Sequence, residues 1–261
     1  QAGGVAFFFM VCSAPCIQKK EWGSVGHALD RHGDTQTPWA HSMACGAAAQ
    51  SFLFARKPMS PIAVIDFETT GVSPGQGARA TEVAIVLLEG GQVVDRFQSL
   101  MKTGVWIPSF ITQLTGITNA MVNAAPDAAQ VMQDAARFVG DAPMVAHNAS
   151  FDSKFWQAEL ALAGLPAPQP FACTVLLSRR LYPEAPSHQL GTLVDYHGLP
   201  RTGQAHRALA DAEMAAALLA RMQHDLRTRW RVAEPSYTLL QTLQRCAKPK
   251  VGALLAQHAG A

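Results

Sequence analysis

The stretch that decides the fold is Pro61-Ile-Ala-Val-Ile-Asp-Phe-Glu-Thr-Thr-Gly71, which begins apolar and ends polar. The run Ile62–Phe67 predicts a buried strand, because short uninterrupted runs rich in β-branched residues suit a sheet covered on both faces. Residues i and i+2 of a strand share a face, so Asp66 and Glu68 project into one site, about 7 Å apart at Cα. Two carboxylates that close repel each other unless a cation lies between them, and oxygen ligands suit Mg²⁺ or Mn²⁺ better than zinc.

The segments around this strand indicate an α/β domain with a mixed sheet, because strands come first and then alternate with helices. A loop is predicted over Gly71–Gly77, and a Glu89-Gly90-Gly91 turn joins two strands over 81–88 and 92–101. A short buried strand is predicted at 144–146. Apolar periodicity predicts the following helices: 126–139, 151–163, 173–182, 188–196, 207–226, 236–245 and 249–258.

Residues 1–58 differ from the rest, since they show neither helical nor strand periodicity. We interpret them as a disordered tail or as upstream sequence, with translation starting at Met59. The alternative is a zinc site, whose ligand types are present but whose spacings do not fit paired zinc-binding blocks. Its candidate ligands are Cys12, Cys16, His27, His32, His41 and Cys45. The predicted domain boundaries are therefore 1–58 for the tail, 59–227 for the catalytic domain and 228–261 for a small helical C-terminal extension.

The composition, with 49% hydrophobic and 15% charged residues among 261, is that of a globular protein. A net charge of +2 is too small to indicate a nucleic-acid partner by itself. The apolar run Val5–Cys12 is much shorter than the roughly 20 residues of a membrane-spanning helix. Five irregularly spaced cysteines favour reduced thiols. We therefore expect a cytoplasmic protein without a membrane partner.

Two further motifs carry acidic residues. His147-Asn-Ala-Ser-Phe-Asp152 follows the strand at 144–146 and places Asp152 in the first turn of the next helix. His206-Arg-Ala-Leu-Ala-Asp211 opens a late helix. A five-residue offset on one helix separates two side chains by about 140°. His206 and Asp211 can therefore share a site only if His206 stands in the loop before the helix.

Together and in this order, the three motifs resemble the DEDDh group of 3′→5′ exonucleases, which includes the proofreading epsilon subunit of bacterial DNA polymerase III. The resemblance covers roughly Pro61 to Arg227, and Ile107-Pro108 with Leu114–Thr118 looks like another segment of that group. His206 marks the histidine subtype. Cys173 departs from the pattern, since family members often carry Asp there. The resemblance implies an RNase H-like fold, with a mixed five-stranded sheet flanked by helices.

The resemblance also implies two Mg²⁺ or Mn²⁺ ions. Asp66 would bridge both, Glu68 and Asp211 would hold one, and Asp152 would position the other. His206 would act as the general base, because an unperturbed imidazole titrates near neutral pH. The terminal nucleotide would be held by a second set of residues: Thr69, Thr70, Leu114, Asn148 and Phe151. For Leu114 and Phe151, ordinary core packing is an equally good expectation.

The implied function is the release of nucleoside monophosphates from DNA 3′ ends, in proofreading or repair. The expected partner is a nucleic acid with a free 3′ end, single-stranded DNA above all. One alternative is a 3′→5′ exoribonuclease similar to RNase T or oligoribonuclease. Another is a subunit whose main task is to bind a DNA polymerase. Sequence cannot distinguish DNA from RNA, because the decisive contact is to a 2′-hydroxyl.

Overall fold

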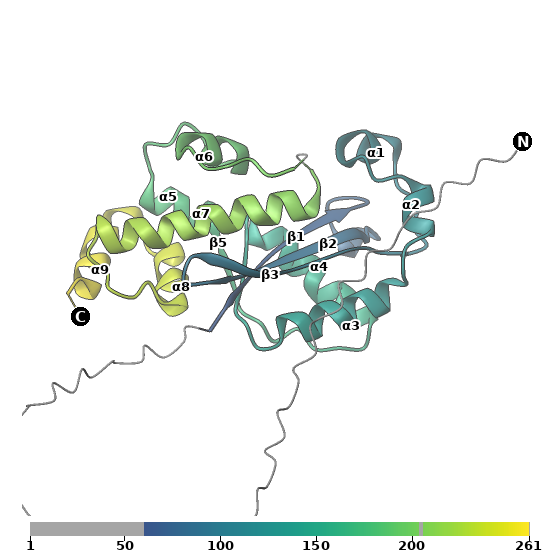
Figure 1. The fold of residues 1–261 in the computed structure, drawn as a ribbon, viewed down its shortest axis with the longest axis horizontal. Coiled ribbons are helices and arrows are strands. Elements are labelled where there is room, and N and C mark those ends of the chain that lie inside the picture. Colours follow the sequence, from purple (N-terminus) through teal and green to yellow (C-terminus); the bar gives the residue numbers. More distant parts are fainter. Residues whose placement is uncertain (1–59, 204–205, 261) are drawn as a thin grey trace, which may run out of the picture. The chain divides into compact units, whose positions relative to one another are not determined.

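The computed structural model describes residues 60–203 and 206–260. Its sheet has five strands in the order β3-β2-β1-β4-β5 (Figure 1). The strands are β1 (Ile62–Thr69), β2 (Ala80–Glu89), β3 (Gln92–Leu100), β4 (Met144–Ala146) and β5 (Phe171–Cys173). β1, β2 and β3 pair antiparallel, whereas β4 and β5 join in parallel beyond β1. The predicted mixed sheet is confirmed.

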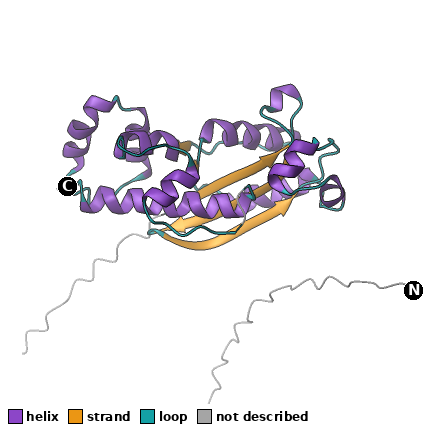
Figure 2. Cartoon of the chain, turned by 90° about the horizontal axis from the view of Figure 1, so that it is seen from above, coloured by secondary structure: helices purple, strands orange, loops and turns teal. Residues whose placement is uncertain are grey.

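Helices cover both faces of this sheet. α7 (Ala208–Thr228) packs on one face, and α3 (Ala128–Val139) and α4 (Ala149–Leu162) pack on the other (Figure 1). Figure 2 shows the strands of the sheet running side by side. β1 serves both cores, because Ile62 and Val64 lie in the cluster with α7 while the alternate residues lie in the cluster with α3 and α4. By the same alternation, Asp66 and Glu68 lie on the face of the sheet that α7 covers.

The remaining helices connect or cover these layers. They are α1 (Ser109–Thr115), α2 (Asn119–Asn123), α5 (Thr174–Leu181), α6 (Leu190–Tyr196), α8 (Tyr237–Arg245) and α9 (Val251–His258), with 3₁₀ turns at Pro74–Gln76 and Lys248–Lys250. α1 and α2 were not predicted. Each is shorter than two helical turns, so the spacing of its apolar residues does not repeat and predicts no helix. α1 ends at Gly116, which adopts the left-handed conformation.

β5 was also missed. No strand was predicted at 171–173, and a helix was predicted from residue 173, whereas α5 begins at Thr174. Three residues are too few to show a strand period, and β4, which is equally short, was predicted only as an apolar run. The strand exists because it has partners on both sides: β4 on one, and the side chain of Gln244 from α8 on the other. Gln244 Oε1 accepts from the Cys173 N–H at 2.7 Å, and its Nε2 donates to the Phe171 carbonyl at 3.4 Å. An α8 side chain thereby covers the open edge of the sheet.

The helices predicted after residue 228 are present as α8 and α9. Leu240 and Leu243 of α8 and Leu255 of α9 are fully buried in the same core as β1 and α7. The tail over 1–58, Met59 and the alternative zinc ligands lie outside the described residues. Across 60–203 and 206–260, no helix combines the length and apolar character needed to cross a bilayer.

Candidate active site

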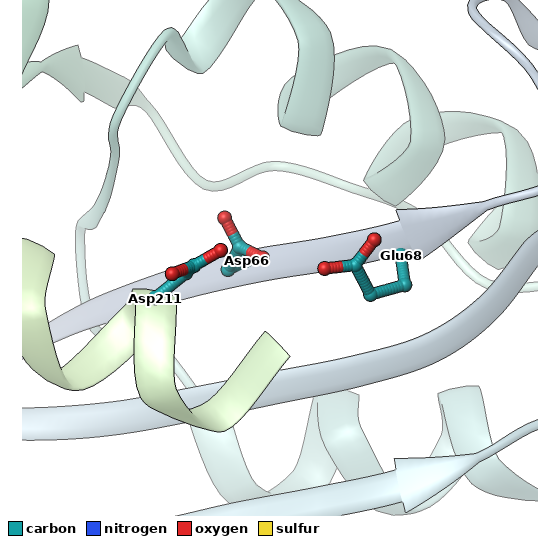
Figure 3. Close-up of side chains that lie close together, drawn as sticks. All are labelled: Asp66, Glu68 and Asp211. Carbon is teal, nitrogen blue, oxygen red and sulfur yellow. The ribbon is translucent and has the colours of Figure 1, made fainter. Parts of the chain in front are cut away.

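Three carboxylates meet at the end of β1. Asp66 and Glu68 come from β1 and Asp211 from the first turns of α7, and each offers an oxygen within 4.8 Å of the others. Figure 3 shows the three side chains facing one another across the space between strand and helix. All three are partly buried. The two-residue spacing on β1 and the passage of α7 over that face together produce this cluster.

His206 stands in a turn before α7, in agreement with the geometry inferred from the five-residue spacing. Its backbone is left-handed, with φ of 60°, and its N–H donates to Asp211 Oδ2 at 3.2 Å. The side chain is exposed. His206 and Asp211 are therefore neighbours, with the imidazole at the solvent side of the acidic cluster.

Asp152 is the fourth acid, and it approaches from the other face of the sheet. It lies in the first turn of α4, is only 2% exposed, and its Oδ1 accepts the N–H of Phe67 at 3.2 Å. Phe67 separates the two acids of β1, so Asp152 is attached to the strand between them. Asp152 is not in the group of three that could share one ion through single oxygens.

A second contact fixes α4. Glu159, buried two turns after Asp152, accepts from Arg79 Nε at 2.9 Å and Nη2 at 2.8 Å, and from the Ala80 N–H at 2.9 Å. Ala80 starts β2 and pairs with Thr69 of β1. Glu159 thus binds the helix of Asp152 to the strand next to β1.

The electrostatics of the cluster favour a bound cation. Burial raises the pKa of Asp66 well above its usual range, and the charge of Asp152 adds to this. Burial and then the charge of Asp211 raise the pKa of Glu68 to about 8. Burial also raises the pKa of Asp152 to about 8, against the hydrogen bond from Phe67, and raises that of Asp211. Several carboxylates held together against these costs form a donor set that fits hard divalent ions.

The two threonines proposed to hold the terminal nucleotide follow the acids directly. Thr69 Oγ1 donates to the Gly71 carbonyl at 2.7 Å, and Thr70 Oγ1 accepts the Arg79 N–H at 3.0 Å. The Thr70 N–H donates to the Arg79 carbonyl at 2.9 Å. These contacts shape the turn after β1. The Thr70 hydroxyl keeps its own hydrogen, so it can still donate to a ligand.

The other three candidates differ in exposure. Leu114 on α1 is 49% exposed, so it does not belong to the core. Phe151 is half-buried and packs against Phe155, with ring centroids 4.9 Å apart. Asn148 is exposed and adopts the left-handed conformation, with φ of 69°, immediately before α4.

Exposed aromatic residues near the end of β1 were not anticipated. Trp106 is 75% and Phe110 64% exposed, and both line a hollow of about 390 Å³ together with Thr70 and Gly71. An exposed aromatic pair beside Thr70 can pack on a nucleobase. The available signal was a Trp and a Phe flanking Ile107-Pro108 in a segment with no apolar periodicity.

A pocket of about 410 Å³ is lined by the residues that follow β4, by α5 and by the segment that leads into α6. Its polar lining comes from His147, Asn148, Arg179, Ser187, His188 and Gln189, and among these described lining residues none is acidic. His147 directly follows β4, whose Val145 pairs with Val64 of β1. Its Nδ1 lies 2.8 Å from Thr174 Oγ1. This lining suits a phosphate group. His188, Arg179 and the pocket itself were missed, because they come from separate helices and loops.

Comparison with known proteins finds similar sequences and structures. A family model described as Exonuclease matches residues 63–219. DNA polymerase III PolC-type of Bacillus subtilis (strain 168) is 38% identical over 164 residues, 62% of this chain but 11% of that protein. The chain thus spans about a ninth of that polymerase's length. DNA polymerase III subunit epsilon of Aquifex aeolicus (strain VF5) is 31% identical over 183 residues, 70% of this chain and 89% of that protein.

Among solved structures, Exonuclease X in complex with 5′ overhanging duplex DNA is similar with a TM-score of 0.56 and 27% identity. The similarity covers 70% of this chain and 99% of that chain. The nuclease domain of 3′hExo, a DEDDh family member bound to rAMP, has a TM-score of 0.56 at 24% identity and covers 64% of this chain and 93% of that chain. It supports the RNase H-like fold alone.

Proposed function

This chain belongs to the exonuclease family, and from that premise we propose that it shortens DNA from the 3′ end by hydrolysis, in the manner of the DEDDh group. The observation that carries the proposal is the meeting of Asp66, Glu68 and Asp211 within 4.8 Å, with His206 bonded to Asp211 through its backbone. Asp152 adds a fourth carboxylate beside Asp66.

The proposed reaction breaks the bond between phosphorus and the 3′-oxygen of the preceding nucleotide. Water attacks the phosphorus, His206 takes a proton from that water, and the departing 3′-oxygen gains a proton from solvent. The products are a nucleoside 5′-monophosphate and a strand with a new 3′-hydroxyl. Two Mg²⁺ or Mn²⁺ ions held by the four carboxylates would supply charge stabilisation and lower the pKa of the attacking water.

The residues beyond the acids would hold the strand. The hydroxyl of Thr70 can donate to the terminal nucleotide, and Leu114 and Phe151 offer apolar surface to its base. Such packing reads no sequence, so we expect little sequence preference. His206, exposed at the edge of the cluster, is free to approach the attacking water.

DNA is favoured over RNA because the polymerase relatives are DNA polymerases by name. Action on RNA, as in RNase T-like enzymes, is the alternative that the first experiment separates. Association with a DNA polymerase is a further hypothesis that rests on the same relatives. Nothing in the geometry of the acidic cluster depends on it.

The test uses purified protein with 5′-labelled single-stranded DNA and RNA of the same sequence, in Mg²⁺, Mn²⁺ or EDTA. Asp66→Ala and His206→Ala are the site variants, and Asp134→Ala removes a carboxylate from the exposed side of α3 as the matched control. A metal-dependent ladder that shortens from the 3′ end, lost in the site variants and kept in the control, supports the proposal. The faster polymer identifies the substrate. Absence of degradation of both polymers in every metal would contradict it.

A further inference from the structure

Glu82 is a buried carboxylate that the proposed chemistry does not use. It lies in β2, is 1% exposed, and each of its oxygens accepts two hydrogen bonds. Oε1 accepts from Gln98 Nε2 at 2.7 Å and Arg207 Nη2 at 2.8 Å. Oε2 accepts from Arg207 Nε and from the Ala208 N–H, both at 3.1 Å. The side chain is therefore fully satisfied, and most of its donors come from the start of α7.

The position of Glu82 relates it to the acids. In the sheet register it stands directly opposite Glu68 of β1, on the face that α7 covers. Arg207 and Ala208 lie between His206 and Asp211 in the chain. The first N–H groups of a helix have no partner within the helix, so a carboxylate that accepts one of them fixes where the helix begins.

We propose that Glu82 is a positioning residue: through Arg207 and the Ala208 N–H it sets the start of α7, and so places His206 and Asp211 against Asp66 and Glu68. The inference rests on the proposed function for its catalytic consequence. Its structural part, the fixing of α7, does not. A displacement of about 1 Å at a reacting group can reduce a rate by about 10²-fold.

Stability alone is a poor reason for this arrangement. A buried ion pair is often no more stabilising than apolar residues of the same volume. Glu82 also adds negative charge beside the cluster, which raises the pKa values of Asp66 and Glu68 further. Unlike an apolar side chain, the carboxylate makes directional hydrogen bonds, bidentate to the guanidinium of Arg207 and single to the Ala208 N–H.

The same helix contains a matched control. Asp225 is a buried carboxylate of α7, 3% exposed, that accepts from Tyr182 Oη at 3.0 Å and from Arg221 Nε at 3.0 Å. It lies 14 residues after Asp211, about 21 Å along the helix. Its loss should reduce stability through a comparable buried contact while leaving the start of α7 in place.

The experiment compares wild type, Glu82→Gln, Arg207→Lys and Asp225→Asn in the full chain. Hydrogen exchange of the peptide over 206–214 is measured without metal, Mn²⁺ affinity by electron paramagnetic resonance, and kcat and KM on the preferred oligonucleotide. We expect Glu82→Gln to speed exchange at 206–214, weaken Mn²⁺ binding about tenfold and lower kcat about 10²-fold, with KM nearly unchanged. Arg207→Lys keeps the charge but loses the bidentate geometry, so it should show the same changes in milder form.

Asp225→Asn should leave the exchange at 206–214, the Mn²⁺ affinity and kcat near their wild-type values, even if its melting temperature falls as far as that of Glu82→Gln. Equal exchange and equal Mn²⁺ affinity in Glu82→Gln and Asp225→Asn would overturn the inference. If Glu82→Gln does not fold, Arg207→Lys decides by the same measures. An inactive wild type would contradict the proposed hydrolysis only, because hydrogen exchange at 206–214 needs neither metal nor substrate.

Discussion

The backbone N–H of Phe67 donates to Oδ1 of Asp152 at 3.2 Å, across 85 residues of sequence. The strand that carries Asp66 and Glu68 is thereby bonded to the helix that carries the fourth acid. The buried carboxylate thus has two tasks: it satisfies a backbone donor of β1, and it contributes negative charge beside Asp66. Substitutions can separate these tasks.

Asp152→Asn should separate charge from structure. Asparagine has nearly the same shape, and its carbonyl oxygen can still accept the Phe67 N–H. We expect a folded protein whose melting temperature without metal is unchanged or higher, because burying the carboxyl group near neutral pH costs either a charge or the uptake of a proton, and asparagine avoids both. Exonuclease activity should fall at least about 10²-fold, since a charge that stabilises the transition state is lost. Thermal unfolding and initial rates check this, with Asp134→Asn as the surface control. A variant that is unstable yet active would contradict it.

The acidic cluster should make stability depend on pH when no divalent ion is present. Glu68 and Asp152 have pKa values raised to about 8 in the folded protein. A raised pKa means that the folded state holds the proton more tightly than the unfolded chain. Its stabilising contribution is therefore complete below the unfolded pKa, near 4, and is lost as the pH rises towards 8. The melting temperature in EDTA should fall between pH 5 and 8, and Mg²⁺ should restore it most at the alkaline end.

His206→Asn tests the imidazole without disturbing the turn. Asparagine tolerates the left-handed conformation that His206 adopts at φ of 60°, and the backbone N–H to Asp211 is kept. Because the side chain is exposed, stability should stay within about 0.5 kcal/mol of wild type. Loss of a positioned base should reduce kcat by about 10²–10⁴-fold while Mn²⁺ affinity is retained. Equal losses of kcat and Mn²⁺ affinity would show that His206 acts through the metal site instead.

Arg179→Ala tests whether the pocket beside His147 contacts the backbone of the nucleic acid. Arg179 is exposed and is the arginine of that pocket's lining. Removing one phosphate contact should raise KM and reduce the slope of log affinity against log salt by about 1, with kcat little changed. Salt titrations of oligonucleotide binding in Ca²⁺ measure this slope. An exposed arginine elsewhere, Arg137→Ala on α3, serves as the control. The same slope in both variants would exclude a contact between this pocket and the nucleic-acid backbone.

Local sequence determined the elements with a strong period and the chemistry of the acids. β1 could be predicted because apolar residues run without interruption to Asp66. The two-residue spacing alone puts Asp66 and Glu68 on one face. The histidine had to precede its helix, because a five-residue offset does not share a helical face, and His206 is found in that turn. The class of the sheet followed from the order of strands and helices.

Only the tertiary structure decided how these pieces meet. β5 has three residues and owes its place to β4 and to Gln244, which lies 71 residues beyond Cys173. Nothing in the local sequence distinguishes Glu82 from other polar residues of a strand, because its partner Arg207 comes from the start of α7, 125 residues away. Local sequence determines periodicity and residue type, since both arise from near neighbours. Partners distant in sequence are determined by packing, because a buried carboxylate persists only where the whole chain supplies its donors.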